Sequence, residues 1–299
     1  MKKIVSATQI CDFTPQLANR HLHSLSFGAK RDIAMLSIDE PVQANGRELR
    51  RKIQTYRFTL HHWHNQSNQE IILPPIQQAY YEAQAMKNDE FLCVASRCHR
   101  QEKNALVFNH DGVLQRSWHV GDGVEDVQVA PNGAIWVSYF DEGVFGDTPI
   151  SNQGLNCFDS EGNRKFGFLN DTTGAAVEIV DCYALNVASN RDTWLLFYTG
   201  FPLVHLREQK VHAIYQATPE MIGCHAFAIC DSRRLFTGGY HFKNRIFWRD
   251  EASKRQVELE VTDQNGDELS WNHACGRGGD LFLCNGPKVW MLSLNEIGF

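Results

Sequence analysis

A pattern of two short apolar runs separated by a polar turn recurs six times along the chain. The clearest copy has the alternating run 124–130, the turn Pro131-Asn132-Gly133 and the apolar run 134–138. Self-similarity at a long period is typical of propeller and solenoid folds, so the repeat constrains the fold before any local motif does. The other copies span residues 22–35, 78–93, 183–197, 225–237 and 272–283.

Six such modules account for the whole length. Equivalent positions of successive copies are 41 to 59 residues apart in the chain of 299 residues. A four-stranded propeller blade needs about 40 to 50 residues, whereas a helical repeat would place apolar residues three and four positions apart. These segments alternate instead. We therefore predict an all-β chain in which residues 1–299 form a single domain, a six-bladed β-propeller of four-stranded antiparallel blades.

The remaining turns agree with this order of strands. Turns that contain Asn, Asp and Gly occur at 108–113, 158–163 and 261–267, where a hairpin would join the third and fourth strands of a blade. The last module has three apolar runs, after which only seven residues remain. We expect its fourth strand to come from residues 3–8 at the N-terminus. Such pairing would close the ring and cover open sheet edges.

Charge and composition narrow the class of protein. The net charge of −6 argues against a nucleic-acid-binding protein, because phosphate contacts need a clustered basic face. The basic cluster at 47–52 is short, and we interpret it as a solvated loop. The sequence has no run of 18 apolar residues and no signal peptide, so we expect a cytoplasmic protein without a membrane partner. The nine cysteines lack a CxxC pair, which predicts free thiols.

The innermost strands of a propeller line a central channel, and their first residues meet at one mouth. Aligning the modules by their turns places acidic, imidazole, phenol and amide side chains there. Glu125, Asp126 and Asn272 could hold a hard divalent cation such as calcium, and the histidines a borderline one such as zinc. Alternatively, these groups bind one another and water. The candidates are Glu125, Asp126, Tyr183, His225, Asn272 and His273, with His21, His23, Gln77 and Gln78 from the first two modules.

Three loops differ from the other connections, because they combine aromatic residues with charged residues and glycines. They span 139–154, 198–204 and 238–245, and each follows the second strand of its module. All three should therefore emerge on one face of the ring. Aromatic residues and arginine dominate the energetics of protein interfaces. The partner-binding candidates on these loops are Tyr139, Phe140, Asp141, Glu142, Phe145, Phe201, Tyr240 and His241.

The clearest module also carries a resemblance to known proteins. Gly121, the strand that follows it, the turn Pro131-Asn132-Gly133 and the run Ile135-Trp136-Val137 resemble the six-bladed propeller superfamily of NHL-repeat and gluconolactonase/regucalcin-like proteins. Gluconolactonase-like enzymes hold a divalent metal in the channel through a Glu of an early Glu-Gly-Pro motif and further Asn and Asp ligands. The first module here lacks that motif, and Glu125, Asp126 and Asn272 match the ligands only loosely. The run 139–146 looks like stretches in uncharacterised bacterial propeller proteins.

Two hypotheses about function follow. In the first, a non-catalytic propeller binds another protein through its loop face, as a scaffold or as an immunity or antitoxin-like protein that neutralises a toxin. In the second, a metal-dependent hydrolase or lyase acts on a small sugar-derived or lactone substrate in the channel. Glu125 or Asp126 and His225 would then serve as metal ligand or general base. The sequence contains no GxSxG elbow, P-loop or HExxH motif, which gives an oligopeptidase or lipase no support.

Overall fold

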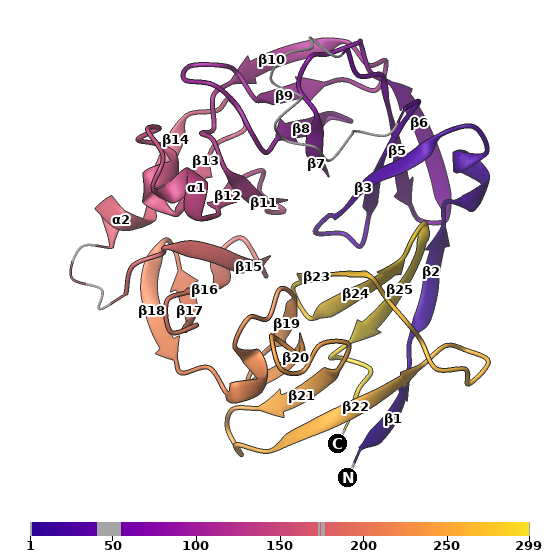
Figure 1. The fold of residues 1–299 in the computed structure, drawn as a ribbon, viewed down its shortest axis with the longest axis vertical. Coiled ribbons are helices and arrows are strands. Elements are labelled where there is room, and N and C mark those ends of the chain that lie inside the picture. The colour runs from indigo at the N-terminus through magenta and orange to yellow at the C-terminus, as the bar shows by residue number, and fades with distance from the viewer. Residues whose placement is uncertain (1, 41–54, 173, 175–176, 299) are drawn as a thin grey trace.

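The computed structural model describes residues 2–40, 55–172, 174 and 177–298. These residues form six mainly antiparallel β-sheets arranged as a ring around a central axis (Figure 1). In each sheet the chain runs from the inner strand to the outer edge, and then returns to the axis for the next sheet. This confirms the predicted six-bladed β-propeller.

The first half of the chain forms three blades of four strands each. Blade 1 contains β3 (His21–Phe27), β4 (Ile33–Ile38), β5 (Phe58–His64) and β6 (Ser67–Ile72). Blade 2 contains β7 (Tyr80–Ala85), β8 (Phe91–Ala95), β9 (Ala105–Phe108) and β10 (Leu114–Trp118). Blade 3 contains β11 (Val124–Val129), β12 (Ile135–Tyr139), β13 (Leu155–Phe158) and β14 (Arg164–Gly167).

The second half forms the other three blades. Blade 4 contains β15 (Asp181–Val187), β16 (Asp192–Tyr198), β17 (Leu203–Arg207) and β18 (Lys210–Tyr215). Blade 5 contains β19 (Phe227–Cys230), β20 (Arg233–Thr237), β21 (Ile246–Asp250) and β22 (Gln256–Thr262). Blade 6 contains β23 (His273–Arg277), β24 (Asp280–Asn285) and β25 (Lys288–Ser293). The short helices are η1 (Thr14–Leu17), α1 (Asp141–Val144), η2 (Ser151–Gln153), α2 (Phe168–Asp171) and η3 (Pro219–Met221).

The N-terminal segment closes the ring, as expected, but with other residues than 3–8. The strand that completes blade 6 is β2 (Thr8–Asp12), which pairs antiparallel with β25. The preceding strand, β1 (Lys3–Ser6), pairs parallel with β22 and becomes a fifth strand of blade 5. The segment therefore crosses from one blade to the next, as Figure 1 shows at the lower right.

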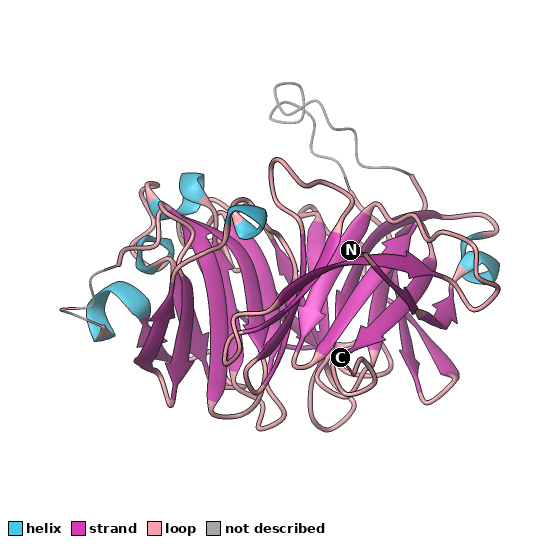
Figure 2. Ribbon diagram, turned by 90° about the horizontal axis from the view of Figure 1, so that it is seen from below, coloured by secondary structure: helices cyan, strands magenta, loops and turns pink. Residues whose placement is uncertain are grey.

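The core lies between the blades. Among the described residues, six apolar clusters each join two neighbouring blades, so that every contact around the ring is filled. The second strands, such as β4 and β12, are buried along their whole length because a blade packs on each face. An outer strand such as β18 instead alternates between exposed and partly buried residues. Figure 2 shows the strands running between the two faces of the ring.

Three further expectations concern composition. All nine cysteines lie among the described residues and are free thiols. No helix in the described part of the chain has the length and apolar character needed to cross a membrane. The basic cluster at 47–52 lies outside the described residues.

Candidate functional site

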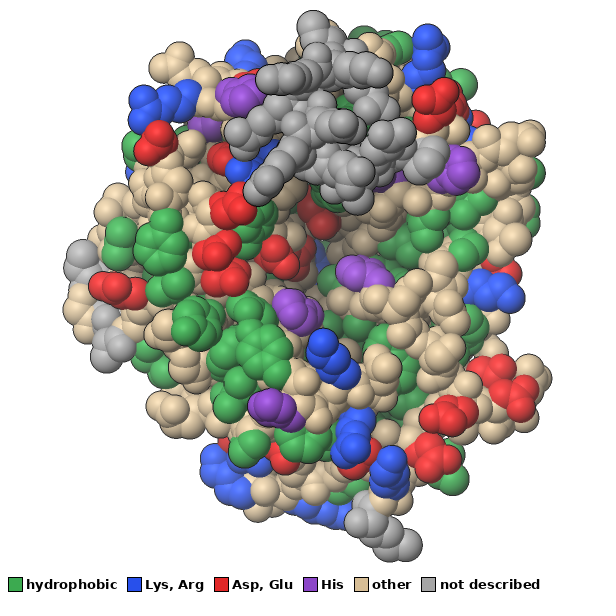
Figure 3. Space-filling view, viewed as in Figure 1, with side chains coloured by type: hydrophobic (Ala, Val, Ile, Leu, Met, Phe, Trp, Pro, Cys, Tyr) green, Lys and Arg blue, Asp and Glu red, His purple; other side chains and the backbone are tan. Residues whose placement is uncertain are grey.

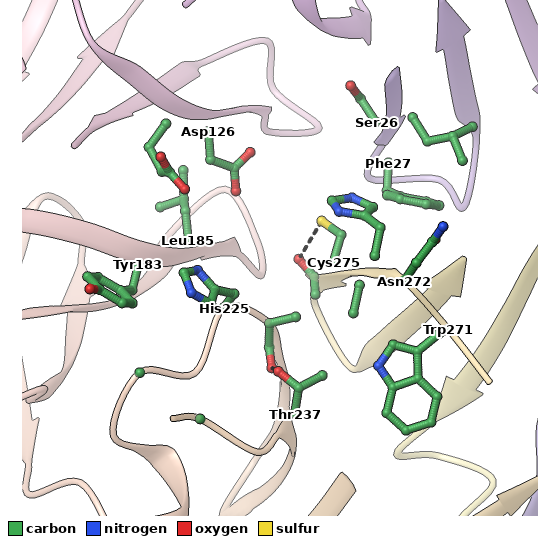
Figure 4. Close-up of a pocket in the computed structure, with 18 of the residues that line it drawn as sticks. Ser26, Phe27, Asp126, Tyr183, Leu185, His225, Thr237, Trp271, Asn272 and Cys275 are labelled. Atoms are coloured by element: carbon green, nitrogen blue, oxygen red, sulfur yellow. Dashed lines mark hydrogen bonds between the residues drawn. The ribbon is translucent and has the colours of Figure 1, made fainter. Parts of the chain in front are cut away.

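The first residues of the inner strands converge on one cavity at the centre of the ring. Its volume is about 560 Å³. Figure 4 shows side chains from several blades around it, with Asp126, Tyr183 and His225 on one side and Asn272 and Trp271 on the other. All six mouth residues named from the sequence line this cavity: Glu125, Asp126, Tyr183, His225, Asn272 and His273.

Inner strands of four neighbouring blades carry a β-bulge at an equivalent position. In β3, β7, β11 and β15 the pairing register skips one residue, namely His23, Tyr81, Glu125 and Tyr183. A bulge leaves one residue out of the ladder and re-aims its side chain. All four skipped residues line the central hollows. The bulges therefore present two phenols, an imidazole and a carboxylate at the mouth.

Three carboxyl groups form one wall of the cavity. Glu82 comes from β7, and Glu125 and Asp126 come from β11. Desolvation and repulsion from Asp126 raise the pKa of Glu125 to about 7. Desolvation raises the pKa of Asp126 to about 6, although the positive charge of Arg277 opposes the rise. The same effects raise the pKa of Glu82 well above its ordinary value. This wall therefore exchanges protons near neutral pH.

Two histidines line other parts of the cavity. Desolvation lowers the pKa of both His225 and His273, so both imidazoles are neutral at physiological pH. The ring of His225 stacks on Tyr183 with the centroids 4.8 Å apart. The Tyr183 hydroxyl in turn shares a hydrogen bond with the hydroxyl of Tyr240 on the loop above. The cavity thus combines carboxyl groups of raised pKa with neutral imidazoles.

Deeper in the channel, polar side chains three residues after each bulge join the inner strands to one another. Gln128, for example, accepts a hydrogen bond from the Val187 N–H at 2.8 Å and donates one to the Leu185 carbonyl at 2.9 Å. These side chains are buried and bound to the backbone of neighbouring blades. We call them the floor: Ser26, Gln84, Gln128 and Asn186.

Arg277 completes the floor. Its side chain is only 4% exposed. Its Nη1 donates to Gln128 Oε1 at 2.6 Å, and Nη2 donates to the Val129 carbonyl. Gln128 also donates to the Gly276 carbonyl at 3.3 Å. Since blades 3 and 6 stand opposite each other, these bonds span the channel and close it below the cavity.

The loop face and the channel mouth are the same face. Each second strand ends where the neighbouring inner strand begins, so the three aromatic loops surround the opening. Tyr240 and Lys243 line the cavity, and Phe140 lines a second hollow of about 680 Å³ that adjoins it. Figure 3 shows acidic and histidine side chains gathered around the central depression of this face. The two candidate regions named from the sequence therefore meet.

Two of the partner-binding candidates are buried, which corrects the expectation that they face a partner. Tyr139 is enclosed between blades 2 and 3, and its hydroxyl donates to the Val120 carbonyl. Phe201 packs edge-on against Tyr183, with the ring centroids 4.9 Å apart. Both rings are buried in the apolar clusters between neighbouring blades, where they are shielded from water.

The other candidates on these loops remain at the surface or near it. Phe145 is 71% exposed and Tyr240 is 44% exposed. Asp141 and Glu142 begin the short helix α1, and Glu142 binds Arg97, which lies 5.6 Å from the centroid of Phe140. His241 is exposed.

The sequence comparison of the modules missed Glu82 and Arg277. Alignment by turns put Gln77 and Gln78 at the mouth of blade 2, but neither lines either of the two hollows there, and His21 does not line them either. The floor residues would have given the correct alignment of blades 2 and 3, because Gln84 and Gln128 both lie three residues after a bulge. Aligning these two glutamines would have placed Glu82 beside Asp126.

The candidate metal ligands do not assemble into a metal centre. In the part of the chain that the structure describes, no group of three or more His, Cys, Asp or Glu could hold an ion. Glu125, Asp126 and Asn272 line the same cavity without forming such a group. We therefore assign no chemical step to a metal.

The fold and the cavity define a six-bladed β-propeller with a polar pocket at the centre of its ring. Residues 155–292 match the model of the YxzG family. No curated protein matches the chain.

Solved structures share the fold at low identity. Virginiamycin B lyase from Staphylococcus aureus is 10% identical with a TM-score of 0.53, over 96% of this chain and 99% of that one. A luciferin-regenerating enzyme is also 10% identical with a TM-score of 0.53, over 97% of both chains. A gluconolactonase from Xanthomonas campestris is 12% identical with a TM-score of 0.49, over 98% and 99% of the two chains. The likeness to the first two structures shows the fold alone.

Proposed function

We propose that the protein binds a small polar molecule in the central cavity and acts on it by general acid–base chemistry, as a hydrolase or lyase. One observation carries this proposal. The carboxyl groups of Glu82, Glu125 and Asp126 face one cavity with raised pKa values, about 7 for Glu125 and about 6 for Asp126, and the neutral imidazoles of His225 and His273 line the same space. Groups with pKa values near the working pH are the most effective acid–base catalysts.

These groups supply both halves of a proton-transfer reaction. A protonated Glu125 or Glu82 can donate a proton to a leaving oxygen. An ionised Asp126 or a neutral His225 can remove one from water or from a carbon acid. Carboxyl groups whose environments separate their pKa values are a common way to divide acid and base roles. Opening a lactone with water and eliminating across a C–O bond both need one donor and one acceptor.

The residues of the cavity support this function, whereas the activities of proteins with a similar fold do not. Virginiamycin B lyase shares the fold, but at 10% identity that likeness assigns no residue a role. The sugar-derived or lactone substrate class remains the one to test first, because the cavity is small and polar. Metal dependence is a separate question, answered by assays with added calcium, zinc or EDTA.

The first test combines an assay with a titration. Hydrolysis of a panel of γ- and δ-lactones is followed by acid release, and we expect Glu125→Gln and Asp126→Asn to lower the rate by about 10²- to 10⁴-fold. Glu208→Gln is the matched control, because Glu208 is an exposed carboxylate paired with Arg191 on the outside of the ring. Carbon NMR then follows the carboxyl groups with pH. Ordinary pKa values near 4 for both residues would contradict the proposal.

A second candidate function is favoured by the exposed apolar residues around the mouth. Phe145 and Tyr240 offer ring surface on the loop face, which suits a protein partner of the scaffold or immunity type. We expect Phe145→Asp to abolish capture of such a partner. Ile72→Asp should leave capture intact, because Ile72 is equally exposed but lies on the outer strand β6. Equal capture by both variants would contradict a loop-face partner.

A further inference from the structure

The second hollow at the mouth differs from the first in its walls. It measures about 680 Å³, is lined by residues of blades 1, 2, 3 and 6, and exposes more apolar than polar surface. Tyr81 and His23 are bulge residues of neighbouring inner strands, and their rings lie 4.8 Å apart. Phe140 and Val124 contribute from blade 3. One end of the mouth is therefore polar and the other is aromatic.

The two hollows are continuous. Both are lined by Leu25, Glu82, Glu125, Asn272 and His273, so a single ligand can occupy both. The carboxyl groups lie at the junction. A molecule whose polar group reaches Glu82 and Glu125 would place its remaining part in the second hollow.

The surfaces there favour a ring over an aliphatic chain. Tyr81 is 44% exposed, and its ring lies against His23 in a tilted arrangement with an interplanar angle of 47°. Across the hollow, the Arg97 guanidinium lies over Phe140 at 5.6 Å. Asp122 holds this guanidinium in place with a hydrogen bond of 3.1 Å. Aromatic rings and guanidinium planes both attract a further ring beyond its apolar area alone.

We propose that the second hollow is a subsite for an aromatic ring of the substrate, bound between Tyr81 and Phe140 while the reacting polar group lies at Glu82 and Glu125. This rests on the proposed function for its reacting end. The ligand class is a small polar molecule, such as a lactone or an ester, that carries an aryl group.

The test uses probes that lack a reacting group, so that its outcome does not depend on turnover. Phenol and cyclohexanol, which have nearly the same size, are titrated into isotopically labelled protein and followed by NMR. We expect phenol to shift the methyl signals of Val124 and Leu25 and to bind about threefold to tenfold more tightly than cyclohexanol. Tyr81→Leu should remove this preference. Tyr198→Leu should keep it, because Tyr198 is 46% exposed but lines neither hollow.

Three results would overturn the subsite: equal affinity for the two probes, signal changes elsewhere, or an unchanged preference in Tyr81→Leu. Failure of the proposed function looks different. In that case phenol binds as expected, but Glu125→Gln leaves lactone hydrolysis unchanged or no hydrolysis is found. Conversely, hydrolysis that depends on Glu125 but shows no preference for aryl lactones would retain the function and reject the subsite.

Discussion

The floor and the mouth of the channel are both polar, yet they differ in how their groups are satisfied. The floor side chains Ser26, Gln84, Gln128 and Asn186 are each bound to the backbone of a neighbouring blade, and Gln128 alone engages Val187, Leu185 and Arg277. At the mouth, the side chains of Glu125 and His273 form no hydrogen bond with other described residues. Buried polar groups with a full set of partners stabilise a unique structure, whereas unsatisfied groups are available to a ligand.

This difference distinguishes polar side chains that hold the fold together from polar side chains that are free to bind a ligand. Residue type alone does not distinguish them, because amides and charged groups occur in both regions. Four predictions test the contrast, beginning with the largest expected effect.

The largest effect is expected where the floor has no room for an added atom. In Gly276→Ala the new Cβ would lie 1.7 Å from the Phe227 carbonyl oxygen, which belongs to the backbone of blade 5 and cannot turn aside. We expect a loss of about 3 kcal/mol or more in the free energy of unfolding, measured by urea denaturation. Gly298→Ala is the control, because a Cβ there meets nothing within 4 Å. Similar losses in both would contradict a tightly closed floor.

A matched pair of amides compares the two regions directly. Asn186 donates to the Phe227 carbonyl at 2.8 Å and accepts from the Gly278 N–H at 2.8 Å, so Asn186→Leu leaves buried backbone groups unpaired. We expect a destabilisation of about 3 kcal/mol by thermal or urea unfolding. The same change at the mouth, Asn272→Leu, should cost less than about 0.5 kcal/mol, because this amide has no such bonds. An equal loss of stability in Asn186→Leu and Asn272→Leu would contradict the difference between floor and mouth.

The pH dependence of stability should also differ. Folding raises the pKa of Asp126 from 3.8 to about 6, so its contribution is fully present below about pH 4 and is lost as the pH rises through 6. Between pH 4.5 and 7.5, we expect the wild type to lose about 1–2 kcal/mol relative to Asp126→Asn.

The control for this slope is Asp250→Asn, measured by the same urea titrations. Hydrogen bonds from Ser232 and Ser253 lower the pKa of the half-buried Asp250 to about 2. Its contribution is therefore present throughout this pH range and is lost only in stronger acid. An equal pH slope in the two variants would show that the mouth carboxyl groups titrate like surface ones.

The smallest effect on stability is expected for Glu125→Gln. The side chain faces the cavity and has no hydrogen-bond partner to lose among the described residues, so we expect the free energy of unfolding to change by less than about 0.5 kcal/mol. Urea denaturation at about pH 4 measures this, because the raised pKa of Glu125 keeps its carboxyl group protonated there in the folded protein, like the neutral amide that replaces it. A loss of several kcal/mol would show that Glu125 is a structural residue like Gln128.

The repeat predicted the architecture because it reflects packing that recurs in every blade. Alternating and apolar runs mark strands, and their spacing marks blades. It could not show which sheet edge the N-terminal strands would join. Residues 3–8 alternate, and alternation determines which side chains face inward but not which edge is paired. Hence β2 completes blade 6, and β1 pairs with blade 5.

The candidate site was predictable only where inner strands could be aligned. The turn at Pro131 gave the alignment of the inner strand of blade 3, and this alignment placed Glu125 and Asp126 at the channel mouth. In blade 2 the bulge at Tyr81 leaves no mark in a single sequence, so Glu82 was missed. Arg277 was missed for a different reason. Charged residues are rarely fully buried, and only the three-dimensional arrangement shows that Gln128 and Val129 supply acceptors for its guanidinium.

The bonds from Arg277 and Gln128 across the ring also determine how molecules travel. With one end of the channel shut, whatever enters the pocket must depart through the same opening. A departing product and an arriving substrate then exclude each other, and a protein seated on the loops would block both. Product release through this opening is therefore a step that can limit the overall rate.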